Sequence, residues 1–240
     1  MLRRGNSSAQ DFAFTAKSVK TCKLSQKNLP LAEGDLKWTD SVTGKPKAEL
    51  LQEERKMMSE EFKRLERTLV QNGKIIDYYQ DTVQVPNGNV VKWDFIGHKG
   101  AAAMLAVRED GKLLMVRQWR NALDRYTLEI PAGGLNSAEE PTEAAAIREL
   151  EEETGYIAGE VRFLLSIYTT VAFCNEKIDI YLARDLKRQE SQHLDEDEFI
   201  DVRACELDEL VQMIYDGKIE DSKTVSAIMT YKALLTDGKL

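Results

Sequence analysis

From Phe62 onward the pattern of apolar and polar residues becomes orderly. It predicts strands at 68–71, 74–85 and 90–96. Asn72-Gly73 separates the first two segments, and the turn-forming run Pro86-Asn87-Gly88-Asn89 separates the second and third. These three segments predict a small antiparallel sheet that precedes the main domain.

Further apolar segments and three helices follow. The segments that predict strands are 101–107, 112–118, 128–130, 161–168, 177–183 and 199–204. The clearest helix is predicted at 141–154, where Pro141 suits the first turn, Gly155 suits the position after the end, and Ala144, Ala145, Ile147 and Leu150 form a buried side. Two more helices are predicted at 207–215 and 222–235. Strands and helices mix without a βαβ rhythm, which favours an α+β layered fold.

The first 57 residues are polar and have no sustained period, so we predict that 1–57 is a disordered or non-native extension. A helix over 50–67 is compatible with the composition there. Gln52-Glu53-Glu54 can be encoded by a purine-rich run resembling a bacterial ribosome-binding site, and Met57-Met58 follow. We hypothesise that the working protein starts at Met57 or Met58, which N-terminal mapping of the native protein would test. The predicted domains are then 58–98, the antiparallel sheet, and 99–240.

Charge and cysteine content narrow the class of protein. The chain has 240 residues, a net charge of −8, and 41 acidic against 33 basic residues. Such a chain predicts no nucleic-acid or membrane partner, and an anionic substrate would need a local cation. Cys22, Cys174 and Cys205 are few and scattered, which is typical of reduced thiols. Without an apolar run of about 20 residues or a signal peptide, we expect a cytoplasmic protein.

Glu149, Glu152 and Glu153 have i, i+3, i+4 spacing, so the helix 141–154 carries three carboxylates on one face. They repel one another and lie near the C-terminal end, where the helix dipole disfavours negative charge. A solvated charged face is the common explanation of such a cluster. The alternative is a divalent cation such as Mg²⁺, with Gly133 and Gly134 letting a backbone carbonyl approach it.

The surrounding spacing decides between these interpretations. Gly134, five residues, Glu140 and seven residues precede the run Arg148-Glu149-Leu150-Glu151-Glu152-Glu153-Thr154-Gly155-Tyr156. This arrangement resembles the signature of the Nudix hydrolases, which implies an α/β/α sandwich with a mixed central sheet. Most relatives place their glycine where Gly133 stands, so the loop is interpreted as one residue longer here.

The resemblance also implies roles for residues. Glu149, Glu152 and Glu153 would be ligands of Mg²⁺, with Mn²⁺ as the alternative ion. The carbonyl of Gly133 would be an additional ligand. Arg148 would orient a glutamate of the helix, and both Arg148 and Glu153 are counted among the catalytic candidates.

Flanking segments are most similar to the ADP-ribose pyrophosphatase branch. The segments are Val116-Arg117-Gln118-Trp119-Arg120, Leu128-Glu129-Ile130-Pro131-Ala132-Gly133 and 194–200. Arg120 is predicted to hold a phosphate with its forked guanidinium, the alternative being a surface arginine. Glu129 is predicted to hold an arginine or a ribose hydroxyl.

Lys92 is a candidate for reaching a phosphate across a dimer. Trp93 and Tyr78 are candidates for stacking on a base, although a core position is the commoner role of an aromatic residue. The resemblance implies that a glutamate of the acidic loop is the general base or an extra metal ligand, Glu198 first and Glu196 second.

One position departs from the branch. Val171 stands where relatives commonly carry proline, and Glu176, which follows, is a candidate for touching substrate or metal. The leading hypothesis is therefore hydrolysis of ADP-ribose to AMP and ribose 5-phosphate. Another nucleotide-sugar or dinucleotide, such as GDP-mannose or a diadenosine polyphosphate, stays open, as does a non-catalytic binding module. Relatives of this branch swap the N-terminal sheet across a two-fold axis, so a homodimer is expected.

Overall fold

The computed structural model describes residues 62–189, 192 and 199–240. The predicted extension 1–57 lies outside the described residues. The helix considered for 50–67 is wrong for its last five residues, because Lys63 to Arg67 belong to β1 (Lys63–Asn72). This strand pairs along its length with β2 (Asp77–Gln84), so cross-strand pairing outweighs the helix propensity of its lysine, leucine and glutamate side chains.

A seven-stranded mixed sheet forms the centre of the domain. Its main path runs β12-β5-β4-β10-β9, with β6 added to β5 and β7 added to β4. Strands β4 and β10 run parallel, and β4 pairs antiparallel with β5 and β7. The bounds are β4 (Ala101–Val107), β5 (Leu113–Arg120), β6 (Arg125–Glu129), β7 (Ala132–Gly134), β9 (Glu160–Tyr168), β10 (Lys177–Arg184) and β12 (Asp201–Cys205).

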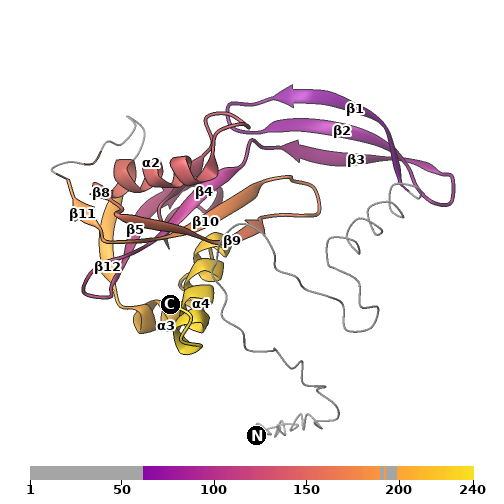
Figure 1. Ribbon diagram of the computed structural model, residues 1–240. Coiled ribbons are helices and arrows are strands. Elements are labelled where there is room, and N and C mark those ends of the chain that lie inside the picture. The colour runs from indigo at the N-terminus through magenta and orange to yellow at the C-terminus, as the bar shows by residue number, and fades with distance from the viewer. Residues whose placement is uncertain (1–61, 190–191, 193–198) are drawn as a thin grey trace, which may run out of the picture. The chain divides into compact units, whose positions relative to one another are not determined.

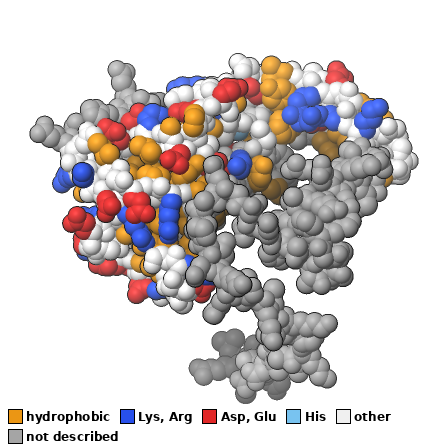
Figure 2. Space-filling view, viewed as in Figure 1, with side chains coloured by type: hydrophobic (Ala, Val, Ile, Leu, Met, Phe, Trp, Pro, Cys, Tyr) orange, Lys and Arg blue, Asp and Glu red, His pale blue; other side chains and the backbone are white. Residues whose placement is uncertain are grey.

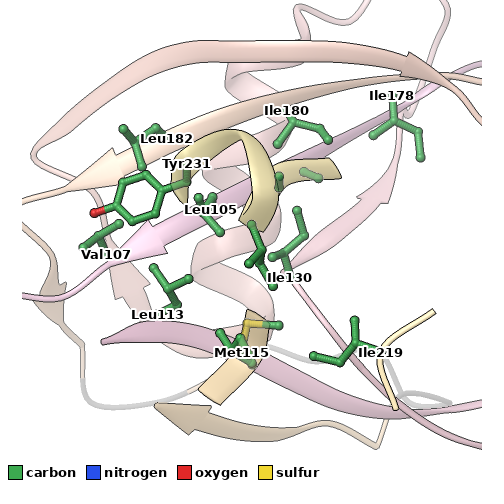
Figure 3. Close-up of a cluster of buried hydrophobic side chains, with 14 of the residues drawn as sticks. Leu105, Val107, Leu113, Met115, Ile130, Ile178, Ile180, Leu182, Ile219 and Tyr231 are labelled. Atoms are coloured by element: carbon green, nitrogen blue, oxygen red, sulfur yellow. The ribbon is translucent and has the colours of Figure 1, made fainter. Parts of the chain in front are cut away.

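Helices cover both faces of this sheet. Figure 1 shows α2 (Thr142–Thr154) on one side and α3 (Leu207–Tyr215) with α4 (Ser222–Thr236) on the other. Alternate residues of β4 therefore enter two separate cores. Ala102, Met104 and Ala106 pack toward α2. Ala101, Ala103, Leu105 and Val107 join the larger cluster that contains Tyr231 of α4, drawn in Figure 3. This layered arrangement confirms the predicted α+β class.

The long predicted elements are confirmed to within a few residues. Helix α2 begins after Pro141 and ends at Gly155, whose φ of 71° is the left-handed conformation that suits glycine. Helix α4 begins after Asp221, whose carboxylate accepts a hydrogen bond from the backbone N–H of Thr224. The sequence pattern did not predict β7, the pair β8 (Tyr156–Ile157) and β11 (Lys187–Arg188), or the 3₁₀ turn η1 (Asn121–Leu123), since two or three residues are too few to show a period.

The N-terminal sheet has the order β1-β2-β3, with β3 at Val90–Gly97. Its cross-strand register gives it two chemically different faces. Leu69, Tyr79 and Phe95 are cross-strand neighbours on one face, called here the apolar face, which Trp93 shares two residues away along β3. The ion pair between Arg67 and Asp81 lies on the same face, with Asp81 opposite Trp93. The opposite face carries polar residues, which include Thr68, Gln80, Thr82, Lys92 and Asp94. Large apolar side chains of this sheet remain exposed, Trp93 by 49% and Leu69 by 50%.

The end of β3 contacts the loop between β9 and β10. The backbone N–H of Ile96 donates to the carbonyl of Phe173 at 2.7 Å, and Ile96 forms a parallel bridge with Cys174. The side-chain amide of Asn175 also bonds both backbone groups of His98. On the molecular face shown in Figure 2, acidic and basic side chains are interspersed rather than gathered into one basic patch.

Candidate active site

Helix α2 places a glutamate directly against a glycine of β7. A Cβ atom added to Gly133 would lie 2.2 Å from the Cδ of Glu149 and 2.2 and 2.3 Å from its two carboxylate oxygens. Only a glycine leaves room for this carboxylate. Gly134 is different, because a Cβ there would meet nothing within 4 Å. The close approach that the sequence predicts for this loop is therefore made at Gly133.

Arg148 lies among the acidic side chains of the helix. Its Nη1 donates to Glu149 at 2.7 Å and to Glu152 at 2.9 Å, and its Nη2 lies 3.5 Å from Glu140. Burial lowers the pKa of Arg148, but the carboxylates of Glu149 and Glu152 outweigh burial and raise it above its ordinary value. Arg148 thus neutralises part of a cluster whose like charges would otherwise destabilise the helix.

Glu153 is the most deeply buried acid of the helix, with 2% of its surface exposed. Its Oε2 accepts a hydrogen bond from the backbone N–H of Ala132 at 3.0 Å, which ties the last turn of α2 to β7. Glu149 and Glu153 are therefore both fixed against the same short strand. The structure brings together the four predicted residues Gly133, Arg148, Glu149 and Glu153, with Glu152 bound through Arg148.

The donor set of this cluster fits a hard divalent cation. Carboxylate oxygens of Glu149, Glu152 and Glu153 lie on one helix face beside the backbone of Gly133, and Mg²⁺ takes oxygen ligands while keeping several waters. Over 62–189, 192 and 199–240, no three acidic, histidine or cysteine side chains are placed so that they could hold a metal ion together. Arg148 instead binds the carboxylates of Glu149 and Glu152, so these oxygens would exchange that partner for a cation when one binds.

A second cluster joins β5 to β6. Arg120 Nε and Nη2 donate to the two carboxylate oxygens of Glu129 at 2.8 and 2.6 Å. Glu129 is 2% exposed, and Thr127 donates to its Oε1 at 2.6 Å. The sequence prediction that Glu129 holds an arginine thus describes the geometry. One edge of the Arg120 fork is occupied by Glu129, so only its remaining N–H groups can reach a phosphate.

The cluster continues into the first turn of α4. Lys223, only 6% exposed, donates to Glu129 Oε2 and to Asp221 Oδ2. Burial raises the pKa of Glu129, but Arg120 and Lys223 outweigh burial and lower it to about 2. Glu129 is therefore ionised at neutral pH. Lys223 was not predicted as a site residue, although a lysine on the helix face that also carries the buried Ala227 and Tyr231 is a detectable signal.

These residues line a cavity of about 590 Å³. Its walls are η1 and β6, the loop between β9 and β10, and the segment that leads into α4, with Arg120, Glu129, Glu176 and Lys223 among the lining residues. Glu129 raises the pKa of Arg120 most strongly, burial lowers it, and the charges of Asp221 and Glu153 add smaller increases. The cavity has the size of a small-ligand site.

Glu176 is held at the cavity wall by Thr169, whose hydroxyl donates to its Oε2 at 2.7 Å. His98 Nε2 lies 3.6 Å from the other oxygen of Glu176. His98 Nδ1 accepts from the backbone N–H of Gly100, so the neutral ring carries its proton on the nitrogen facing Glu176. Glu176 therefore lines the same cavity as Arg120 and Glu129. Its contact with substrate or metal stays a prediction.

The other predicted residues lie elsewhere. Lys92 is on the polar face of the N-terminal sheet, where its Nζ donates to Gln80 at 2.9 Å. Tyr78 donates to Asp94 on the same face. Trp93 projects from the opposite, apolar face. Glu196 and Glu198, the predicted bases, lie outside the described residues.

Comparisons with known proteins show which proteins this chain is similar to. A family model described as NUDIX domain matches residues 97–228. The chain is 41% identical over 173 residues to an ADP-ribose pyrophosphatase of Bacillus subtilis (strain 168), which covers 72% of this chain and 93% of that protein. It is also 41% identical over 158 residues to a methanol dehydrogenase activator of Bacillus methanolicus, covering 65% and 85% respectively.

A solved structure described as an ADP compounds hydrolase matches with a TM-score of 0.65 at 21% identity, covering 75% of this chain and 97% of that one. At this identity the match shows the fold. Within the part of the chain that the structure describes, no helix has the length and apolar character needed to span a bilayer.

Proposed function

Because this chain belongs to the Nudix hydrolase family, we propose that it hydrolyses the diphosphate linkage of ADP-ribose, giving AMP and ribose 5-phosphate in the presence of Mg²⁺. The family match covers 97–228, and a relative 41% identical over 93% of its own length is an ADP-ribose pyrophosphatase. The observation that carries the proposal is the contact between the Glu149 carboxylate and Gly133, beside Glu152 and Glu153 on the same helix face.

Each cluster has a part in this proposal. When bound, a divalent cation would neutralise phosphate charge and make a coordinated water more acidic. Glu149, Glu152 and Glu153 would hold it, with the carbonyl of Gly133. Arg148, which now bridges Glu149 and Glu152, would keep these side chains in position when ligands exchange.

Arg120 and Glu176 would bind substrate in the cavity. The unoccupied N–H groups of Arg120 can donate to phosphate oxygens, while Glu129 keeps the guanidinium in place. Glu198, or else Glu196, would accept the proton of the attacking water. The water oxygen forms a bond to one phosphorus, and the bond from that phosphorus to the bridging oxygen breaks.

The N-terminal sheet supports a homodimer in this proposal. Its apolar face exposes Leu69 and Trp93, and such a face is stabilised by being covered. A second copy of the chain would cover it. Lys92, the candidate for reaching a phosphate across the dimer, lies on the opposite face of this sheet, so covering the apolar face does not by itself bring it to the partner's substrate. Light scattering that gives a monomeric mass at micromolar concentration would contradict this part.

A substrate panel tests the proposed reaction. Purified protein with Mg²⁺ is offered ADP-ribose, GDP-mannose, a diadenosine polyphosphate and a nucleoside triphosphate, and the release of AMP or phosphate is measured. We expect ADP-ribose to be turned over fastest. Faster turnover of GDP-mannose would support the second candidate, which stays open because Val171 stands where the branch commonly has proline. Mn²⁺ in place of Mg²⁺ tests the choice of ion.

Glu152→Gln tests the metal assignment with a small structural perturbation. The side chain of Glu152 is 39% exposed, and Arg148 would still form its ion pair with Glu149. The fold should therefore persist. We expect loss of metal-dependent turnover with circular dichroism unchanged. Glu151→Gln is the matched control, because that acid bonds Gln189 rather than Arg148. Equal activity of Glu152→Gln and wild type would contradict the assignment of Glu152 as a ligand.

A further inference from the structure

Lys223 is a buried lysine whose charge needs an explanation. It lies on the face of α4 that also buries Thr224, Ala227 and Tyr231, where an apolar side chain would pack without desolvating an ammonium group. Its Nζ donates to Glu129 and, at 3.0 Å, to Asp221. Buried ion pairs commonly stabilise a fold no better than apolar residues of similar volume. Packing alone therefore does not account for a lysine at this position.

The four charged groups of this cluster balance. Arg120 and Lys223 are cationic, Glu129 and Asp221 are anionic, and the sum is zero. Without Lys223, the wall of the cavity would carry a net charge of about −1. A diphosphate would then approach a repulsive surface in a region of low dielectric, where charges interact more strongly than in water.

Lys223 also completes the hydrogen bonding of the Glu129 carboxylate. Oε1 accepts from Arg120 Nε and from Thr127, and Oε2 accepts from Arg120 Nη2 and from Lys223. Donors on both oxygens fix the plane of this carboxylate. Because Arg120 binds through a planar two-point contact, its orientation follows that plane.

We propose that Lys223 is a positioning residue for the substrate diphosphate: it fixes Glu129 so that Arg120 presents its free N–H groups to the cavity, and it balances the negative charge of that wall. The proposal rests on the proposed function, since it assumes a diphosphate substrate. It adds the start of α4, which lies about 100 residues from Arg120 in sequence, to the substrate-binding apparatus.

The test is Lys223→Met, compared with Lys232→Met on the same helix. Lys232 is an exposed lysine that pairs with Asp208 at 2.7 Å, so its loss removes an ion pair of α4 away from the cavity. For Lys223→Met we expect KM for ADP-ribose to rise about 10- to 100-fold, the range for losing a charged hydrogen bond. We expect kcat to change by less than about threefold, because substrate and transition state lose the same interaction. Lys232→Met should match wild type in both constants.

The double variant Glu129→Gln with Lys223→Met separates charge balance from simple damage. It removes the carboxylate that Lys223→Met leaves without its lysine partner. The double variant therefore also provides a test if Lys223→Met folds poorly. We expect its KM to recover only in part toward wild type, because the net charge of the cavity wall is restored while Arg120 has lost the carboxylate that orients it. A role limited to holding α4 in place predicts no recovery. Either an unchanged KM in Lys223→Met or an equal rise in Lys232→Met would overturn the proposal.

A binding measurement distinguishes failure of the Lys223 proposal from failure of the proposed function. The dissociation constant of the methylene-bridged analogue of ADP-ribose is measured by calorimetry for wild type and both single variants. Wild-type protein that binds the analogue without cleaving ADP-ribose would contradict the proposed function alone. A dissociation constant raised about tenfold or more in Lys223→Met, and in that variant only, would still support the role of Lys223.

Discussion

Gly133→Ala is the substitution for which the structure gives the sharpest expectation. The new Cβ would lie 2.2 Å from the carboxylate carbon of Glu149. A tolerable contact begins near 3.0 Å, so the carboxylate must move by at least 0.8 Å, the difference between these distances. The obstacle is the end of a flexible side chain, so a rotamer change relieves the clash. We therefore expect a stability loss of at most about 1 kcal/mol.

Activity should respond much more strongly. Mg²⁺ requires ligand distances of about 2.0–2.1 Å and near-octahedral geometry, which a carboxylate displaced by 0.8 Å cannot supply. Misplacement on the scale of 1 Å costs about 100-fold in rate, or about 2.7 kcal/mol. We expect kcat/KM to fall by about that factor, and the Mg²⁺ concentration for half-maximal rate to rise.

Gly134→Ala is the matched control, since a Cβ there meets nothing within 4 Å. The assay is steady-state hydrolysis of ADP-ribose over a Mg²⁺ titration, with thermal unfolding of each variant beside it. If both alanine variants retain wild-type activity and the same Mg²⁺ dependence, the close packing of Glu149 on Gly133 does not serve metal binding. If Gly133→Ala unfolds, the assumption that Glu149 can move aside is wrong.

Two further predictions concern stability and assembly. The pKa of Glu129 falls from 4.5 to about 2 on folding, so its contribution is fully present above about pH 4.5 and is lost as the pH falls toward 2. Urea unfolding at a series of pH values from 7 to 2 should show the free energy of unfolding falling by about 3 kcal/mol from this group. Glu129→Gln should not show that fall. The same pH dependence in both proteins would contradict the prediction. Trp93→Glu, on the apolar face of the N-terminal sheet, should halve the mass measured by light scattering, whereas Gln80→Glu on the polar face should not. Dimers of both variants would show that this apolar face is not the interface.

The sequence predicted what depends on local patterns. Helix α2 and its ends follow from Pro141, Gly155 and the spacing of apolar residues, and α3 agrees with its predicted bounds. The glutamate cluster followed from helical spacing in the same way. The misassigned region, Lys63 to Arg67, has composition compatible with a helix, and it is a strand because β2 lies beside it.

Long-range contacts explain what the sequence left out. Lys223 reaches Glu129 across 94 residues, and no local pattern reports that approach. For the same reason, Arg120 and Glu129 could be predicted as separate site residues, but not that Glu129 binds one edge of the Arg120 guanidinium. The distinction between Gly133 and Gly134 also required coordinates, because it depends on which Cα the Glu149 carboxylate approaches.

The parallel pairing of β4 with β10 has a consequence for biosynthesis. Every residue of β4 is buried in the folded chain, yet Lys177, the first residue of β10, is translated 76 residues after Ala101. At about 5–20 residues per second, a ribosome needs roughly 4 to 15 s to cover that interval. During this time β5, β7 and α2 can contact β4, while the edge that later pairs with β10 and the face that α4 later covers have no partner. The nascent chain, more than the finished protein, is therefore the species that requires protection from aggregation.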